Sequence, residues 1–147
     1  MSTPNGAPVS ITPVGYTAFV ELHHLYYELY AFARLGDVGL AEQVVELVLR
    51  QTEADWAWAL RDDPAAFTWQ ALCEAVTVAR KNAPTSPPDG LHRSMPERAA
   101  DAALLHESLG LELAAAAALM GLEEPAVHAQ LKAAHRWRFG NHPTGGS

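Results

Sequence analysis

The sequence predicts an all-α protein in which a proline-rich linker joins two small helical modules. Apolar residues recur at steps of three and four, the spacing of one helix face, while the alternating runs of a strand are missing. Residues 82–91 (NAPTSPPDGL) hold three prolines and one glycine, and such a stretch does not continue a helix. The predicted parts are a flexible tail (1–15), a first module (16–82), the linker (83–95), a second module (96–140) and a second flexible tail (141–147).

Three helices are predicted in the first module. The first helix has one apolar face, made of Phe19, Leu22, Leu25, Tyr26, Leu29, Phe32 and Ala33. The turn at residues 36–39 (GDVG) ends it, and a second helix then runs from about Leu40 to Leu60. The third helix starts at Asp63 and Pro64, because an aspartate caps free backbone amides and a proline suits the first helical position.

The second module is also predicted to be helical. Ser94 and Glu97 have the spacing of a capping box, and the helix that follows them ends at Gly110. A short alanine-rich helix over residues 113–120 comes next, then a turn at Gly121 and a last helix. This order and spacing are those of a helix-turn-helix.

The last helix, which begins at Pro125, is basic. Residues 126–139 hold Lys132, Arg136 and Arg138 and no acidic residue, so this segment carries a formal charge of +3 in a chain of −7. The net negative charge argues against a general nucleic-acid coat, because such binding depends on neutralising phosphates, but it leaves room for a local basic patch. The alternative is a plain three-helix bundle, because lysine and arginine also suit the C-terminal end of a helix.

The cysteine, tryptophan and histidine residues give little support for a metal or redox site. The single cysteine, Cys73, excludes an intramolecular disulfide and a multi-thiolate cluster, and its apolar neighbours indicate a core position. His128 and His135 share a helix face, but two imidazoles alone do not make a site, so neither a metal nor another cofactor is predicted. The tryptophans of the first module are interpreted as core residues, with stacking on unpaired bases as the alternative: Trp56, Trp58 and Trp69.

An enzyme and a membrane protein are both disfavoured. The sequence has no phosphate-binding loop, nucleophile elbow or paired catalytic carboxylates. The N-terminus lacks the basic start and apolar run of a signal peptide, and no apolar stretch is long enough to span a bilayer. We therefore expect a cytoplasmic protein without a membrane partner.

Two stretches of the chain resemble conserved regions of the extracytoplasmic-function sigma factors of bacteria. The stretch ALLHESLGLELAAAAALMGLEEPAVHAQLKAAHRW (103–137) is similar to their fourth region, in which a helix-turn-helix reads the minus-thirty-five promoter element. The stretch FVELHHLYYELYAFARLGDVGLAEQVVELVLRQ (19–51) is similar to their second region, including a Gly-Asp turn between two helices. Both stretches occur in the family order, so the resemblance implies a second-region-like three-helix bundle followed by a fourth-region-like helix-turn-helix.

This resemblance implies a transcription regulator whose partners are RNA polymerase core and promoter DNA. Glu42, Gln43 and Glu46 match the face that, in the family, docks on the clamp helices of the polymerase β′ subunit. The candidate DNA-binding residues are His128, Gln130, Lys132, His135, Arg136 and Arg138. A recognition helix of this kind enters the major groove, where its first turns reach base edges and its basic side chains hold phosphates.

Several residues depart from the family pattern, and all of them reduce the affinity expected for DNA. Glu123 and Glu124 stand at the start of the last helix, where they repel a phosphate, and the usual capping serine or threonine is missing. The arginine-rich run after the third helix is reduced to Arg80 and Lys81. The alternative is therefore a sigma-like fold that serves as a protein-interaction or ligand-sensing module without direct DNA binding. An anti-sigma or other regulatory protein, or a second copy of the chain, is then a candidate partner.

Overall fold

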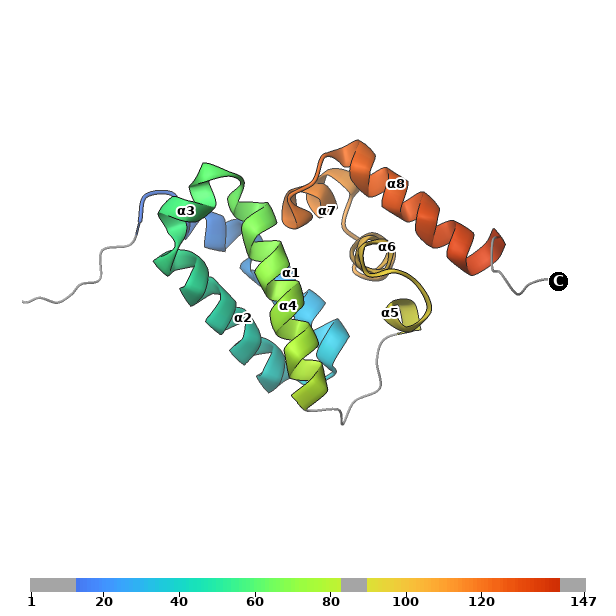
Figure 1. The fold of residues 1–147 in the computed structure, drawn as a ribbon, viewed down its shortest axis with the longest axis horizontal. Coiled ribbons are helices and arrows are strands. Elements are labelled where there is room, and N and C mark those ends of the chain that lie inside the picture. The colour runs from blue at the N-terminus through green and yellow to red at the C-terminus, as the bar shows by residue number, and fades with distance from the viewer. Residues whose placement is uncertain (1–12, 83–89, 141–147) are drawn as a thin grey trace, which may run out of the picture.

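The computed structural model describes residues 13–82 and 90–140, and every regular element in these ranges is a helix. The α-helices are α1 (Tyr16–Leu35), α2 (Val38–Ala54), α3 (Trp56–Arg61), α4 (Pro64–Asn82), α5 (Gly90–Ser94), α6 (Glu97–Ala103), α7 (Leu113–Met120) and α8 (Glu124–His135). Leu104–Ser108 and Arg136–Gly140 form π-helical turns after α6 and α8. The predicted tails and linker lie partly outside the described residues, at 1–12, 83–89 and 141–147. The all-α prediction is confirmed (Figure 1), and no described helix is both long enough and apolar enough to cross a membrane.

α1 ends at the Gly-Asp turn and α4 starts at Pro64 as the sequence predicts, but α2 starts at Val38, two residues before its predicted start near Leu40. Gly36 takes a left-handed conformation with φ 71°, and its N–H donates to a carbonyl four residues earlier, which closes α1. The Asp37 carboxylate accepts a 3.0 Å hydrogen bond from the Leu40 N–H and caps α2. Asp63 accepts a 3.1 Å bond from the Ala65 N–H at the start of α4.

The single helix predicted to reach Leu60 is wrong, because the chain bends at Asp55 and divides into α2 and α3. Trp56 accounts for the bend. Its indole N–H donates to the Val14 carbonyl over 2.8 Å, and its ring meets that of Tyr16 edge-on at a centroid distance of 5.5 Å. These contacts join residues far apart in the chain, so the local sequence carries no signal for them.

The short helix α5 lies in the stretch that the sequence predicts as linker. The predicted capping box of Ser94 and Glu97 does not form. Instead the Ser94 hydroxyl donates back to the Gly90 carbonyl over 2.9 Å, and Pro96 stands at the N-cap of α6 without a side-chain cap. Ser94 therefore bonds to the backbone of α5 and does not cap α6.

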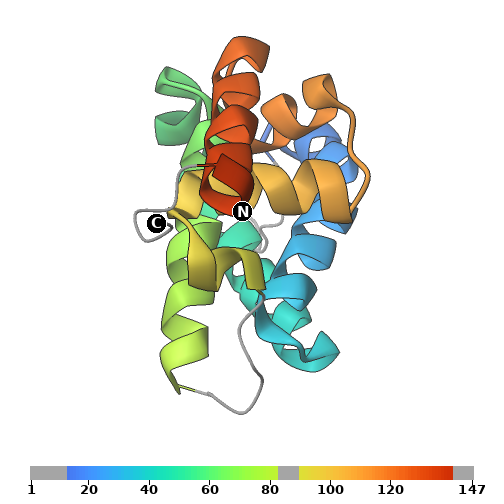
Figure 2. The ribbon, with the colours of Figure 1, turned by 90° about the vertical axis from the view of Figure 1, so that its right-hand side faces the viewer.

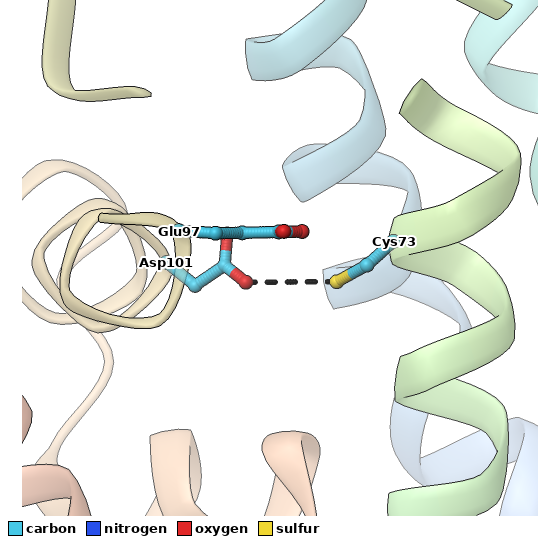
Figure 3. Close-up of side chains that lie close together, drawn as sticks. All are labelled: Cys73, Glu97 and Asp101. Carbon is cyan, nitrogen blue, oxygen red and sulfur yellow. Dashed lines mark hydrogen bonds between the residues drawn. The ribbon is translucent and has the colours of Figure 1, made fainter. Parts of the chain in front are cut away.

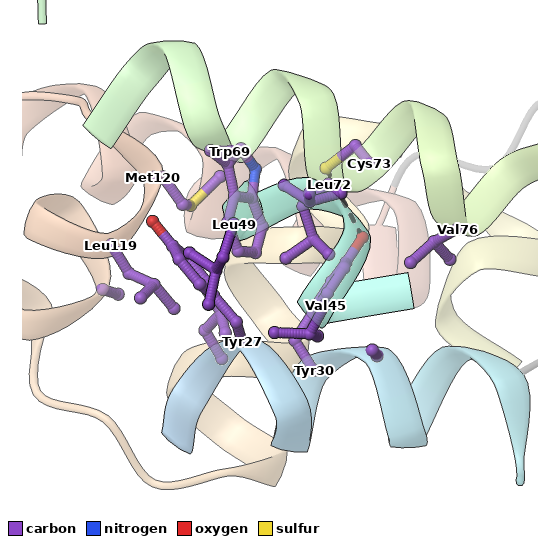
Figure 4. Packing of buried hydrophobic residues seen from close by; sticks show 14 of the residues in the cluster. Tyr27, Tyr30, Val45, Leu49, Trp69, Leu72, Cys73, Val76, Leu119 and Met120 are labelled. Atoms are coloured by element: carbon purple, nitrogen blue, oxygen red, sulfur yellow. Dashed lines mark hydrogen bonds between the residues drawn. The ribbon is translucent and has the colours of Figure 1, made fainter. Parts of the chain in front are cut away.

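The apolar face predicted for α1 lies mostly on the solvent side. Of its members only Phe19 is buried, whereas Leu22 and Leu25 are 70% and 59% exposed. The core takes the opposite face, from which the fully buried Tyr27 and Tyr30 point toward α4 (Figure 4). Both faces of the helix are apolar, and hydrophobic periodicity alone does not say which of two such faces is buried.

The helices of both predicted modules share one hydrophobic core. Figures 1 and 2 show α5–α8 packed together on one side of the α1–α4 bundle. The buried cluster extends from Tyr16 in α1 to Val127 in α8, and it contains Leu119 and Met120 of α7 together with Trp69 of α4. The structure therefore does not separate the chain into two independent units.

A tight contact between the two halves lies at Gly121. Its φ is 71°, a left-handed conformation that favours glycine. A Cβ atom built at this position would lie 2.3 Å from the backbone nitrogen of Ala66, near the start of α4. Glycine is therefore needed both for the turn before α8 and for the close packing of that turn on α4.

We expect Gly121→Ala to lower the free energy of unfolding by roughly 3 kcal/mol or more, because the added methyl group collides with backbone of α4. Gly110→Ala is the matched control, since Gly110 also has a positive φ, 77°, but no atom lies within 4 Å of its Cβ position. The control is expected to lose only about 1 kcal/mol, from backbone strain. Urea unfolding followed by circular dichroism measures both variants, and equal losses would contradict the tight contact.

Candidate functional site

The predicted helix-turn-helix consists of α7, the Gly121 turn and α8. Gly121 ends α7, and its N–H donates to the Ala117 carbonyl. After the turn, α8 packs inward through Val127 and Ala134, both completely buried, and through the half-buried Leu131. Contacts of α8 with α6 and α7 hold it on the small bundle that these helices form. The segment after Gly121 is thus an amphipathic helix with one face on the protein and one face toward solvent.

The six candidate DNA-binding residues do not all lie on the solvent side of this helix. His128, Lys132 and His135 are exposed, and their spacing of four and three residues places them on one face. Arg136 is exposed as well, in the turn that follows α8. Gln130 is half-buried and lies three and four residues from the buried Val127 and Ala134, at the edge of the face that packs on the protein.

Arg138, the sixth candidate, is also only partly exposed. Its guanidinium forms a 2.5 Å ion pair with the Glu107 carboxylate, and it lies 5.6 Å from the centre of the Phe139 ring. This pairing neutralises part of the positive charge that the sequence assigns to the segment. Glu123 and Glu124 are both exposed at the start of α8, so the acidic rim expected from the sequence is present.

The three candidate polymerase-binding residues lie together on the solvent face of α2. Glu42, Gln43 and Glu46 are all exposed, and the neighbouring Leu47 is 56% exposed. Glu42 and Glu46 line a shallow groove of about 420 Å³ between α1 and α2. Figure 1 places α2 and α8 toward opposite sides of the molecule, so the two candidate surfaces do not form one site.

A separate polar cluster lies where α6 packs on α1 and α4, and its centre is Asp101. This carboxylate is 1% exposed. Its Oδ1 accepts a 2.7 Å hydrogen bond from the Tyr30 hydroxyl and lies 2.6 Å from Nε2 of His92. Its Oδ2 accepts a 3.5 Å bond from the Cys73 thiol, and Arg34 donates to the Tyr30 oxygen over 2.6 Å.

The cluster borders a cavity of about 640 Å³ between α4 and the α6–α7 segment. Cys73 of α4 and Glu97 and Asp101 of α6 point toward one another across this seam (Figure 3). Burial, together with the nearby charge of Asp101, raises the pKa of the Cys73 thiol. In this state the cysteine is a protonated, unreactive group, in agreement with its interpretation as a core residue.

Two of the three tryptophans interpreted as core residues are buried. Trp56 and Trp69 are 6% and 7% exposed, but Trp58 is 62% exposed, so the core prediction is wrong for it. Trp58 stands on the outer side of the short helix α3, where the guanidinium of Arg61 lies 4.7 Å from its ring centre.

The sequence alone does not predict the cluster around Asp101. Its members are distributed over α1, α4, α5 and α6, and no spacing along the chain connects them. One local signal was present: Asp101 is the acidic residue of the run AADAALL, and a carboxylate surrounded by apolar residues in a helix is a candidate for burial.

A scan of the chain against protein-family models finds no matching family, and a search of curated proteins finds no match. The resemblance to sigma factors thus depends on the two sequence stretches, 19–51 and 103–137, and it stays a prediction.

The Tyr27 hydroxyl is completely buried and has no hydrogen-bond partner among the described residues. We expect Tyr27→Phe to raise the free energy of unfolding by about 1 kcal/mol at neutral pH, because it removes a buried polar group that nothing satisfies. Tyr30→Phe is the control with the opposite sign, because the Tyr30 hydroxyl bonds to Asp101 and Arg34 and its loss costs roughly 1–3 kcal/mol.

Burial also raises the pKa of Tyr27, with a further contribution from the charge of Asp63. The unfolded tyrosine ionises near pH 10 while the folded one stays protonated, so this part of the stability is intact below about pH 10 and falls above it. Thermal unfolding between pH 8 and pH 11 should therefore show a shallower alkaline loss for Tyr27→Phe than for the wild type. An unchanged pH slope, or a less stable variant at neutral pH, contradicts the buried, unsatisfied hydroxyl.

Proposed function

We propose that the chain is a sigma-factor-like transcription regulator, with α2 as its contact to RNA polymerase core and α8 as its contact to promoter DNA. The observation that carries this proposal is the α7–Gly121–α8 arrangement, in which α8 packs through Val127 and Ala134 and presents His128 and Lys132 to solvent. The major groove is about 12 Å wide, and an α-helix with its side chains is about 10–12 Å across, so such a helix fits the groove.

The charges around α8 predict weak binding to DNA by the chain alone. Lys132 and Arg136 are exposed cations, whereas Arg138 is paired with Glu107 and the N-cap of the helix is an exposed acidic residue, Glu123. Affinity that depends on so few phosphate contacts is largely lost at physiological salt. Docking on polymerase would raise the local concentration of promoter DNA around α8 and compensate for this weakness.

The solvent face of α2 has a composition suited to a helical, basic partner. Glu42 and Glu46 provide negative charge, and the exposed Leu47 beside Gln43 offers an apolar anchor. Charge complementarity of this kind directs encounter and orientation, while the apolar contact contributes affinity.

Binding to DNA tests the α8 half of the proposal. A duplex selected from a random-sequence pool in the presence of polymerase core is titrated with the chain over a series of salt concentrations. Lys132→Ala and Arg136→Ala should each weaken binding and reduce the slope of log K against log salt by about one. Arg50→Ala is the control, because Arg50 is an exposed arginine on α2, toward the opposite side of the molecule from α8, and the variant should leave the slope unchanged. Salt-independent binding, or equal effects of all three variants, would contradict promoter contact through α8.

A second candidate function, a protein-interaction module, is favoured by the outer face of α1. Four large apolar side chains recur there at steps of three and four: Leu22, Leu25, Leu29 and Phe32. This is the seam pattern of a helix that packs on another helix. Glu21 and Glu28 flank the seam, so a partner helix with basic flanks fits this face better than a second copy with acidic ones.

One binding experiment separates the two candidates. Purified polymerase core is incubated with the wild type, with Glu42→Lys/Glu46→Lys and with Leu25→Glu/Leu29→Glu, and co-sedimentation is measured. Both double variants change only exposed side chains, so both should fold. The proposed function predicts loss of binding of tenfold or more for the α2 variant and none for the α1 variant. Loss of binding by the α1 variant alone supports the interaction through α1. If the folded wild type does not bind polymerase core, the polymerase proposal is wrong.

A further inference from the structure

We propose that Cys73, Glu97 and Asp101 form a binding site for a transition-metal cation, with Zn²⁺ as the best fit, at the seam between α4 and α6. The site does not depend on the proposed function, and its test is independent of DNA and polymerase. One thiol and two carboxylates are ligands that zinc accepts, whereas magnesium and calcium avoid sulfur.

The distance between the Cys73 sulfur and the Asp101 carboxylate fits a tetrahedral centre. One ligand atom from each of the three residues lies within 4.8 Å of the other two. The Cys73 sulfur and Oδ2 of Asp101 are 3.5 Å apart. With zinc–sulfur and zinc–oxygen bonds of about 2.3 Å and 2.0 Å, a tetrahedral angle separates the two ligand atoms by roughly 3.5 Å. A cation can therefore take the place of the proton that the Cys73 thiol donates to Asp101, and α4 need not move away from α6.

The rest of the cluster holds Asp101 in a ligating orientation. Tyr30 and His92 both contact Oδ1, at 2.7 Å and 2.6 Å, so Oδ2 is directed to the Cys73 side (Figure 3). Partners of this kind behind a ligand fix its position and are a regular part of metal sites. They come from α1 and α5, so the orientation of the carboxylate does not depend on a flexible surface side chain.

The site is also accessible. All three residues line the cavity of about 640 Å³, and Glu97 is exposed at its edge, where its carboxylate can turn toward an arriving ion. The cavity leaves room for a water molecule as the fourth ligand, as in zinc sites with three protein ligands.

Binding must release a proton, because the ligand is the thiolate. The Cys73 S–H bond breaks, the sulfur–metal bond forms, and the proton leaves to solvent, without any change of oxidation state. Arg34 behind Tyr30 and Arg98 on the cavity wall offset the excess negative charge of three anionic ligands. Within residues 13–82 and 90–140, the other titratable side chains that contact the cluster or line the cavity are Tyr30 on α1, Glu74 on α4 and His92 on α5.

Titration of the full chain, stripped of metal with a chelator, tests the proposal. With Zn²⁺ in a calorimeter we expect one equivalent to bind at micromolar concentration or tighter, with a heat that changes with the ionisation enthalpy of the buffer because a proton is released. With Co²⁺ in place of Zn²⁺, a thiolate-to-metal charge-transfer band should appear in the near-ultraviolet spectrum.

Three variants complete the test. Cys73→Ser should lose the charge-transfer band, and Glu97→Gln, an exposed change that leaves the core intact, should weaken Zn²⁺ binding by tenfold or more. Glu74→Gln is the matched control, because Glu74 lines the same cavity but is not one of the three proposed ligands. The Glu74→Gln variant should bind Zn²⁺ with the same affinity as the wild type. Absence of saturable binding, absence of the band in the wild type, or equal weakening by Glu74→Gln and Glu97→Gln each overturns the proposal.

Discussion

The position of α6 against α1 and α4 depends on one buried carboxylate. Asp101 is 1% exposed, and burying an unpaired charge costs several kcal/mol in a protein interior. Contacts with Tyr30 and His92 compensate for that cost, and the Cys73 thiol adds a weaker hydrogen bond; the three residues come from three other helices. If α6 moved off the bundle, these partners would be lost together. The contact of Gly121 with α4 adds a steric restraint at the other end of the same interface.

This interface has a consequence for function, because it fixes the direction in which α8 faces. The exposed side of α8 carries Lys132, and the exposed side of α2 carries Glu42 and Glu46, toward the opposite side of the molecule. A shared core allows little independent movement of the two surfaces. A regulator that uses both must therefore either meet DNA and polymerase at this fixed spacing or separate the interface at Asp101 and Gly121. The sigma-like proposal thus makes that interface the element on which activity depends.

The sequence predicted what local chemistry determines. The roles of Gly36, Asp63 and Gly121 follow from local requirements: a left-handed turn needs glycine, and a free helix amide needs an acceptor. Both requirements act within a few residues. Features that depend on distant residues were not predictable. The bend before Trp56 depends on Val14 and Tyr16, which are distant in the sequence, and α1 has two apolar faces of which long-range packing selects one.

The cluster around Asp101 also joins residues that are distant in the sequence, so local patterns do not predict it. The partners of its two carboxylate oxygens need different explanations. Tyr30 and His92 on Oδ1 of Asp101 are enough to fix the register of α6, which is a recognised use of buried polar groups. Fixing the register of α6 does not explain why a cysteine, Cys73, contacts Oδ2 of Asp101. A thiol is a weak donor, so its 3.5 Å contact adds little to the position of α6. The metal proposal gives this sulfur and the exposed Glu97 one common role, as ligands at the same seam.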